Sequence, residues 1–170
     1  ISHFKESTLH SEASARTFSI GTAHHGAPAL FKNGTIAVTQ KDGSTAWTLP
    51  ERVRVIDMDG NELHASTIQT GGIHGEAGNG ETVLFGCVEG ILRVNQDGTQ
   101  SLIANPASFG DEWIGSILYG AESEVFIGFD SGRGVYEIDL ATETIEVIEE
   151  NDKLVAATFD WEGHNLILVY

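Results

Sequence analysis

The chain has 170 residues, 41% of them hydrophobic, and its 25 acidic residues outnumber its 9 Lys and Arg residues, giving a net charge of −16. This length can bury a sizeable core, and no apolar run approaches the roughly 18 residues that a membrane-spanning helix requires. A surface of this charge repels nucleic acid and anionic lipid and attracts cations. We therefore expect neither a nucleic-acid partner nor membrane insertion.

Short β-rich runs follow one another along the chain, separated by turn dipeptides that end in glycine. Ahead of these runs, only residues 7–15 could form a short helix or an irregular arm. The dipeptides are Asn33-Gly34, Asp42-Gly43, Asp59-Gly60, Asn79-Gly80, Asp97-Gly98 and Ser131-Gly132. Such pairs favour tight hairpins between antiparallel strands.

The runs repeat. A unit of strand, turn and outer strand occurs at 53–63, 91–102 and 134–145, with Asp57, Asn95 and Asp139 at equivalent places, 38 and 44 residues apart. Another strand precedes each copy, at 34–38, 82–86 and 124–128, and upstream of these strands lie His25-Gly26, His74-Gly75 and Ile114-Gly115. Val155-Ala156 opens a fourth copy.

Four strands that recur every 40 to 45 residues or so are typical of a β-propeller blade. A solenoid has a shorter repeat, and a sandwich has none. We predict an all-β fold, a β-propeller fragment of about three to four blades of four-stranded antiparallel sheet, with a trailing strand in front of the first blade. Residues 1–170 are expected to form one domain, a partial propeller truncated at both ends. Open strand edges would favour self-association of such a fragment.

Candidate ligands for a metal lie at the start of the first strand of the repeat, which lines the channel of a propeller. His25 and His74 are 49 residues apart, one repeat, and should converge on one rim, with His24 beside the first and Glu76 two residues after the second. Imidazole nitrogen and carboxylate are ligands that zinc prefers. We name His25, His74, His24 and Glu76 as the candidate zinc site.

Simpler interpretations stand beside this one. His25 and His74 could be solvated loop residues, His24 the exposed neighbour of a ligand, and Glu76 a rim carboxylate that caps backbone amides. The remaining histidines, His3, His10, His64 and His164, are expected at the surface. Cys87 follows Val83 and Phe85 at strand period, which favours a buried, inert thiol over a thiolate ligand.

Three sequence motifs resemble the AztD-type periplasmic zinc metallochaperones. They are His-His-Gly within 22–27, His-Gly-Glu-Ala within 73–77 and Phe-Gly-Cys within 84–92, and the likeness extends over roughly 22–170. The resemblance implies a β-propeller, encoded beside a zinc ABC transporter, whose zinc-handling rim includes His25 and His74, with His24 and Glu76. In that family a Cys precedes the His-Gly-Glu-Ala motif. Residues 69–73 contain none, so the resemblance implies no disulfide here and Cys87 is expected to be free.

The expected function is that of a periplasmic zinc carrier, which passes zinc to the solute-binding protein of a zinc ABC importer. No HExxH, GxSxG, CxxC or phosphate-binding glycine loop is present, so we do not expect an enzyme. Two alternatives stay open. One is a metal-dependent β-propeller hydrolase or lactonase, and the other is a non-catalytic propeller that serves protein interaction.

Overall fold

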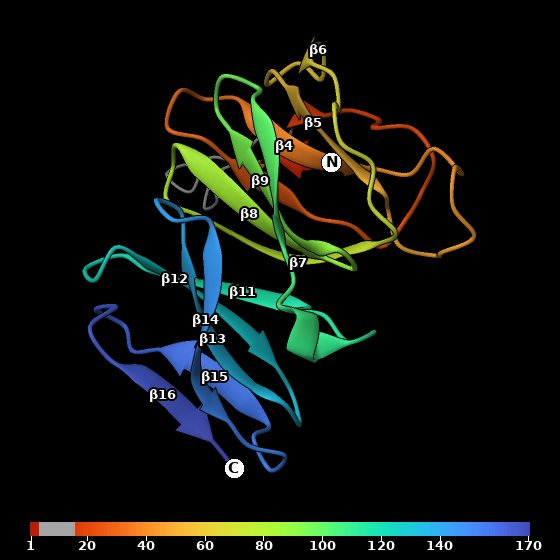
Figure 1. Ribbon diagram of the computed structural model, residues 1–170. Coiled ribbons are helices and arrows are strands. Elements are labelled where there is room, and N and C mark those ends of the chain that lie inside the picture. Colours follow the sequence, from red (N-terminus) through yellow and green to blue (C-terminus); the bar gives the residue numbers. More distant parts are fainter. Residues whose placement is uncertain (4–15) are drawn as a thin grey trace.

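The computed structural model describes residues 1–3 and 16–170 (Figure 1). The arm predicted at 7–15 and His10 lie outside these residues. Within the described part, the regular secondary structure consists of strands apart from one 3-10 turn, η2 (Ala107–Phe109). This part contains no helix that is long and apolar enough to cross a membrane.

Three four-stranded antiparallel sheets succeed one another along the described chain, and in each the strands lie side by side in sequence order. We call them blades 1, 2 and 3. Blade 1 contains β3 (Pro28–Leu30), β4 (Ile36–Gln40), β5 (Arg52–Ile56) and β6 (Glu62–His64). Blade 2 contains β7 (Ile73–Gly78), β8 (Thr82–Cys87), β9 (Gly90–Asn95) and β10 (Gln100–Ala104). Blade 3 contains β11 (Ser116–Gly120), β12 (Val125–Asp130), β13 (Gly134–Asp139) and β14 (Thr144–Glu150).

Two shorter sheets flank the blades. β15 (Ala156–Phe159) pairs with β16 (Leu166–Val169) and forms the fourth copy that the repeat predicted. In front of blade 1, β1 (Ser2–His3) pairs with β2 (Arg16–Thr17), where the sequence had predicted a single trailing strand. The N-terminal strands and the β15–β16 hairpin lie at opposite ends of the molecule (Figure 1).

The hairpin turns follow from the dipeptides of the repeat. In the β5–β6 turn, a carboxylate oxygen of Asp57 accepts the backbone N–H groups of Asp59 at 2.8 Å and Asn61 at 2.9 Å, while Gly60 adopts a φ of 88°. The Asn61 side chain also donates to this carboxylate, and these bonds lower the pKa of Asp57. Because a positive φ favours glycine, the Asp-x-Asp-Gly pattern encodes this turn locally.

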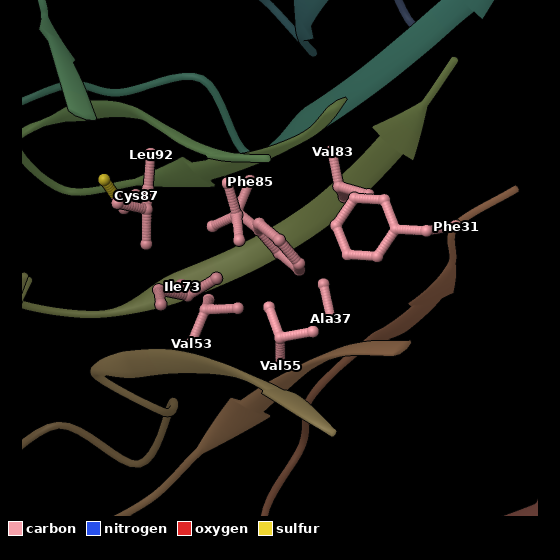
Figure 2. Close-up of a cluster of buried hydrophobic side chains, with 10 residues drawn as sticks. Phe31, Ala37, Val53, Val55, Ile73, Val83, Phe85, Cys87 and Leu92 are labelled. Carbon is pink, nitrogen blue, oxygen red and sulfur yellow. The ribbon is translucent and has the colours of Figure 1, made fainter. Parts of the chain in front are cut away.

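The hydrophobic core lies between neighbouring blades. Figure 2 shows the cluster between blades 1 and 2, in which Val53 and Val55 of β5 face Val83 and Phe85 of β8. A second cluster joins blades 2 and 3 and includes Leu84 of β8. Because successive side chains of a strand point to opposite faces, β8 is buried on both faces, which explains its unbroken apolar run.

This stacking determines which residues meet at the rim, by which we mean the residues that lead into or begin the first strands of the blades. β3 lies against β7, β7 against β11, and β11 against β15, so the first strands of successive blades are neighbours. Residues at the start of these strands therefore meet, although they are about one repeat apart in sequence.

Candidate metal site at the rim

Two histidine rings from neighbouring blades lie against each other at this rim. His25 precedes β3, and His74 is the second residue of β7. Their ring centroids are 5.3 Å apart, and the ring planes are inclined by only 7°, so the imidazoles are stacked. Both side chains are exposed to solvent. The folding of one blade against the next thus brings together two imidazole side chains that the sequence separates.

A backbone carbonyl from blade 3 orients the second of these rings. Nδ1 of His74 lies 2.8 Å from the carbonyl oxygen of Gly115. A carbonyl can only accept, so Nδ1 carries the proton and Nε2 keeps its lone pair. Metal-binding histidines commonly donate their other ring N–H in this way, because the bond fixes both the tautomer and the orientation of the ring.

A cavity of about 150 Å³ opens beside the two rings, lined by residues 25–27 of blade 1 and 73–76 of blade 2. One water molecule occupies about 30 Å³ of liquid, so this volume can hold a cation with several waters. The lining offers the imidazoles of His25 and His74 and the carboxylate of Glu76, which are the nitrogen and oxygen ligands that zinc accepts.

A β-bulge turns Glu76 toward this cavity. The pairing of β7 with β8 places His74 opposite Gly86 but Glu76 opposite Phe85, so Gly75 is left outside the ladder. In an unbroken ladder Glu76 would oppose Leu84, which packs toward blade 3. Residues directly opposite each other share a face of the sheet, so the bulge gives Glu76 the face of Phe85, toward blade 1 and His25.

The Glu76 carboxyl group is half-buried and has a perturbed pKa. Burial raises the pKa above its ordinary value, an effect that the neighbouring His74 and the backbone amide of Glu76 itself partly oppose. A carboxylate that has lost part of its hydration gains more from an adjacent cation than a fully solvated one does. The capping of other backbone amides, the simpler interpretation of Glu76, is not among the interactions that the described residues show for it.

His24 occupies a different place from its neighbour. Its ring fills the space where a side chain of Gly26 would lie, with ring atoms 2.4 Å from the ideal Cβ position. Both of its ring nitrogens are buried and have no hydrogen-bond partner within the described residues. An unsatisfied buried polar group costs about 1–3 kcal/mol, which a ligand at this point would remove. His24 is therefore not the exposed neighbour that the sequence suggested as its simpler interpretation.

The candidate ligands do not form an enclosed site. Within residues 1–3 and 16–170, no group of three or more His, Cys, Asp and Glu side chains is arranged to hold a metal ion. The lone pair of an imidazole nitrogen lies in the plane of its ring, so two stacked rings direct their lone pairs into parallel planes. One ring must turn before both can bind the same ion.

The other histidines and Cys87 lie away from this cavity. His64 is exposed on the outer strand β6, and His164 is exposed in the β15–β16 turn, as predicted. The side chain of His3 is outside the described part of the structure. Cys87 is free and fully buried, and its thiol donates to the carbonyl oxygen of Gly90 at 3.2 Å. Burial raises the pKa of this thiol to about 12, which makes it a poor metal ligand, as the sequence predicted.

Comparison with known proteins identifies the fold. No protein-family model and no curated protein sequence matches the chain. Among solved structures, AztD from Citrobacter koseri superimposes with a TM-score of 0.81 over 98% of this chain, at 18% identity. The chain shares the fold of AztD. The apo form of AztD from the same organism superimposes with a TM-score of 0.77 over 94% of the chain, at 20% identity.

The similarity to AztD covers less than half of that protein, because the chain spans 46% and 44% of the two AztD structures. The same fold occurs elsewhere. A Bacteroides thetaiotaomicron protein of unknown function superimposes over 92% of this chain and 44% of its own, with a TM-score of 0.55 and 15% identity. The architecture alone therefore does not specify a function.

Sequence reasoning missed one contributor to the site, the carbonyl group of Gly115. The Ile114-Gly115 pair had been recognised as the third copy of the His-Gly element, but it carries no histidine and was left without a role. The available signal was that Ile114-Gly115 leads into the first strand of blade 3, because the first strands of successive blades are neighbours.

Proposed function

We propose that this chain binds zinc at the rim and carries it, as a periplasmic metallochaperone of the AztD type, to the solute-binding protein of a zinc ABC importer. Zinc is here the cargo and not a resident cofactor. The observation that carries the proposal is the meeting of His25 and His74 at one cavity, with the His74 tautomer held by the Gly115 carbonyl. The AztD fold and the three motifs support it.

A carrier needs a site that a partner can open. Fully enclosed four-ligand zinc sites are structural, whereas a site with few protein ligands keeps positions for water or for another protein's ligands. Two exposed imidazoles with a carboxylate on the same cavity fit this requirement. The receiving protein could then replace the ligands one at a time, without extracting a caged ion.

The charge of the chain supports the same role. A net charge of −16 concentrates cations near the surface and favours docking to a partner that is less acidic. Most of the described basic side chains are already engaged. Lys41, Arg52 and Arg54 pair with Glu51, Asp42 and Glu62.

The proposal predicts that zinc affinity depends on both rim histidines. Replacing His25 or His74 by Ala should each weaken zinc binding about 10-fold or more, because each removes one of the few nitrogen ligands. Folding should be little affected, since both side chains are exposed. Binding can be measured by competition with a chromophoric chelator. Imidazole binds metal only when it is neutral, so protons compete with zinc and the affinity should fall as the pH is lowered.

His64→Ala and His164→Ala are the matched controls, because both are exposed histidines far from the cavity and should leave zinc affinity unchanged. The proposal is wrong if the rim variants bind zinc as tightly as these controls. Turnover of a lactone or ester that requires the rim histidines would favour the hydrolase alternative instead.

A further inference from the structure

The two rim histidines are held in different ways. His74 donates from Nδ1 to the carbonyl oxygen of Gly115, a backbone group immediately before β11 of blade 3. For His25, the described residues supply ring stacking on His74 but no hydrogen bond to either ring nitrogen. The first ring therefore has a fixed tautomer and orientation, whereas the second keeps the freedom to turn about its side-chain bonds.

The close approach of the Gly115 carbonyl depends on the residue after His74. Gly75 has a φ of 62°, and a Cβ built on it would lie 2.3 Å from the Gly115 oxygen and 2.9 Å from the Cα of Ser116. Real Cβ atoms do not approach backbone atoms so closely. Any side chain at position 75 would push away the very carbonyl that accepts the hydrogen bond of His74.

We propose that Gly75 is a positioning residue, whose lack of a side chain lets the Gly115 carbonyl hold His74 as the Nδ1–H tautomer, with Nε2 left for the ligand. His74 is then the fixed ligand and His25 the one that turns toward an ion already held at Nε2. The assignment of ligand roles rests on the proposed zinc function. The tautomer and its dependence on Gly75 do not.

The stacking of the two rings favours different roles for His74 and His25. Both rings cannot offer lone pairs to one ion while their planes are parallel. A turn of His74 would break its bond to Gly115, whereas a turn of His25 breaks no hydrogen bond within the described part of the chain. A cation that reaches the cavity should therefore meet Nε2 of His74 first.

Nitrogen NMR of the metal-free chain tests the tautomer directly, because protonated and bare imidazole nitrogens have well-separated chemical shifts. The chain would be labelled with ¹⁵N in its histidines, and His74 and His25 assigned from His→Gln variants. At a pH where the imidazoles are neutral, His74 should show a proton on Nδ1 alone, and His25 a mixture of both tautomers. A mixture at His74 in the unmodified chain would overturn the inference without any variant.

Gly75→Ala tests the positioning role, with Gly110→Ala as its control. Gly110 has nearly the same φ, 61°, but a Cβ there meets no atom within 4 Å, so both variants place a Cβ at a positive φ and only one disturbs a carbonyl. In Gly75→Ala the proton of His74 should move toward Nε2, and zinc affinity should fall about 10-fold. Gly110→Ala should retain the tautomer and the affinity. An unchanged tautomer in folded Gly75→Ala would contradict the role.

The two proposals can fail separately. If His74 shows the Nδ1–H tautomer but the chain binds no zinc in the chelator assay, the positioning of His74 stands and the proposed function is wrong. If zinc binding requires both histidines but the His74 tautomer is mixed, the function stands and the positioning role of Gly75 is wrong.

Discussion

Glu76 is a rim residue whose ionisation affects the stability of the folded chain. Its carboxyl group is half-buried at a cavity, and burial raises its pKa above the ordinary value of 4.5. The folded state thus disfavours the charged form, and the protein bears this cost at neutral pH until a cation compensates for it. Charged groups that are unfavourable in the folded state are common at binding sites, because function and stability compete there.

We expect Glu76→Gln to raise the free energy of unfolding at pH 7, by about 1 kcal/mol or less, because water still screens a half-exposed group. The folded-state pKa lies above the unfolded one, so the contribution of Glu76 to stability is most favourable below pH 4.5 and falls as the pH rises. The gap between variant and parent should therefore widen from pH 4.5 to pH 7 in thermal unfolding.

Glu81→Gln is the control for this experiment. Glu81 follows in the β7–β8 turn. Its side chain is 64% exposed and makes, within the described residues, only a 3.7 Å ion pair with the exposed Lys32. Its replacement should change stability by no more than about 0.5 kcal/mol at either pH. A Glu76→Gln variant that is less stable than its parent at pH 7 would show that the carboxylate is satisfied in the folded state.

Among the elements, the β4–β5 connection has an unusual internal support. The side chain of Glu51 is completely buried, and its two oxygens accept Lys41 Nζ at 3.0 Å and the backbone N–H groups of Asp42 and Ser44 at 3.2 and 3.0 Å. The connection leaves β4 at the end where Thr39 pairs with Ala27, so it lies at the same end of blade 1 as His25. We therefore expect Glu51 to stabilise the connection on the side of blade 1 that carries His25.

Glu51→Ala should lower the free energy of unfolding by about 3 kcal/mol, because it removes the carboxylate that pairs with the largely buried Lys41 and that accepts the backbone N–H group of Asp42. Glu62→Ala is the control. Glu62 also pairs with a basic residue, Arg54, at 3.2 Å, but its side chain is 43% exposed. The loss there should be within about 1 kcal/mol. Denaturant unfolding measures both, and equal losses would contradict the support that we assign to Glu51.

At the scale of the molecule, the strand β16 differs from its equivalents. The second strands of the blades, β4, β8 and β12, are largely buried on both faces. β16 has the same apolar character, but only one face packs, with Leu166 and Leu168 against blade 3. On the other face Ile167 and Val169 are each 46% exposed, and no further strand pairs with its edge in the described chain. Exposed apolar edges of this kind recruit other strands.

We expect the chain to self-associate through β16, in a concentration-dependent manner that sedimentation velocity would detect. Introducing charge with Ile167→Lys and Val169→Lys should shift the equilibrium toward monomer by about 10-fold or more, because a buried charge without a partner is costly. Val147→Lys is the control, since Val147 is 56% exposed on the outer strand β14 of blade 3. A chain that stays monomeric at high concentration, or one that Val147→Lys dissociates equally, would contradict this use of β16.

The sequence by itself determined the elements and their order. The turn dipeptides, the repeat at Asp57, Asn95 and Asp139, and the alternation of Val83, Phe85 and Cys87 are local signals, because φ preferences and side-chain alternation act over a few residues. They sufficed to predict four-stranded blades, the fourth copy at Val155-Ala156, and a buried, unpaired Cys87. The spacing of one repeat also predicted that His25 and His74 converge, and their rings do meet, although His25 precedes β3 and His74 lies within β7.

Only the tertiary structure decided how these histidines meet. The stacking of the rings, the bond from His74 to Gly115, and the burial of both His24 nitrogens arise between blades and have no local signature. The bulge at Gly75, which turns Glu76 toward blade 1, changes the register by one residue, and a one-residue change moves a side chain to the other face of the sheet. Sequence spacing predicts which residues can come together. Their orientation depends on the packing of one blade against the next.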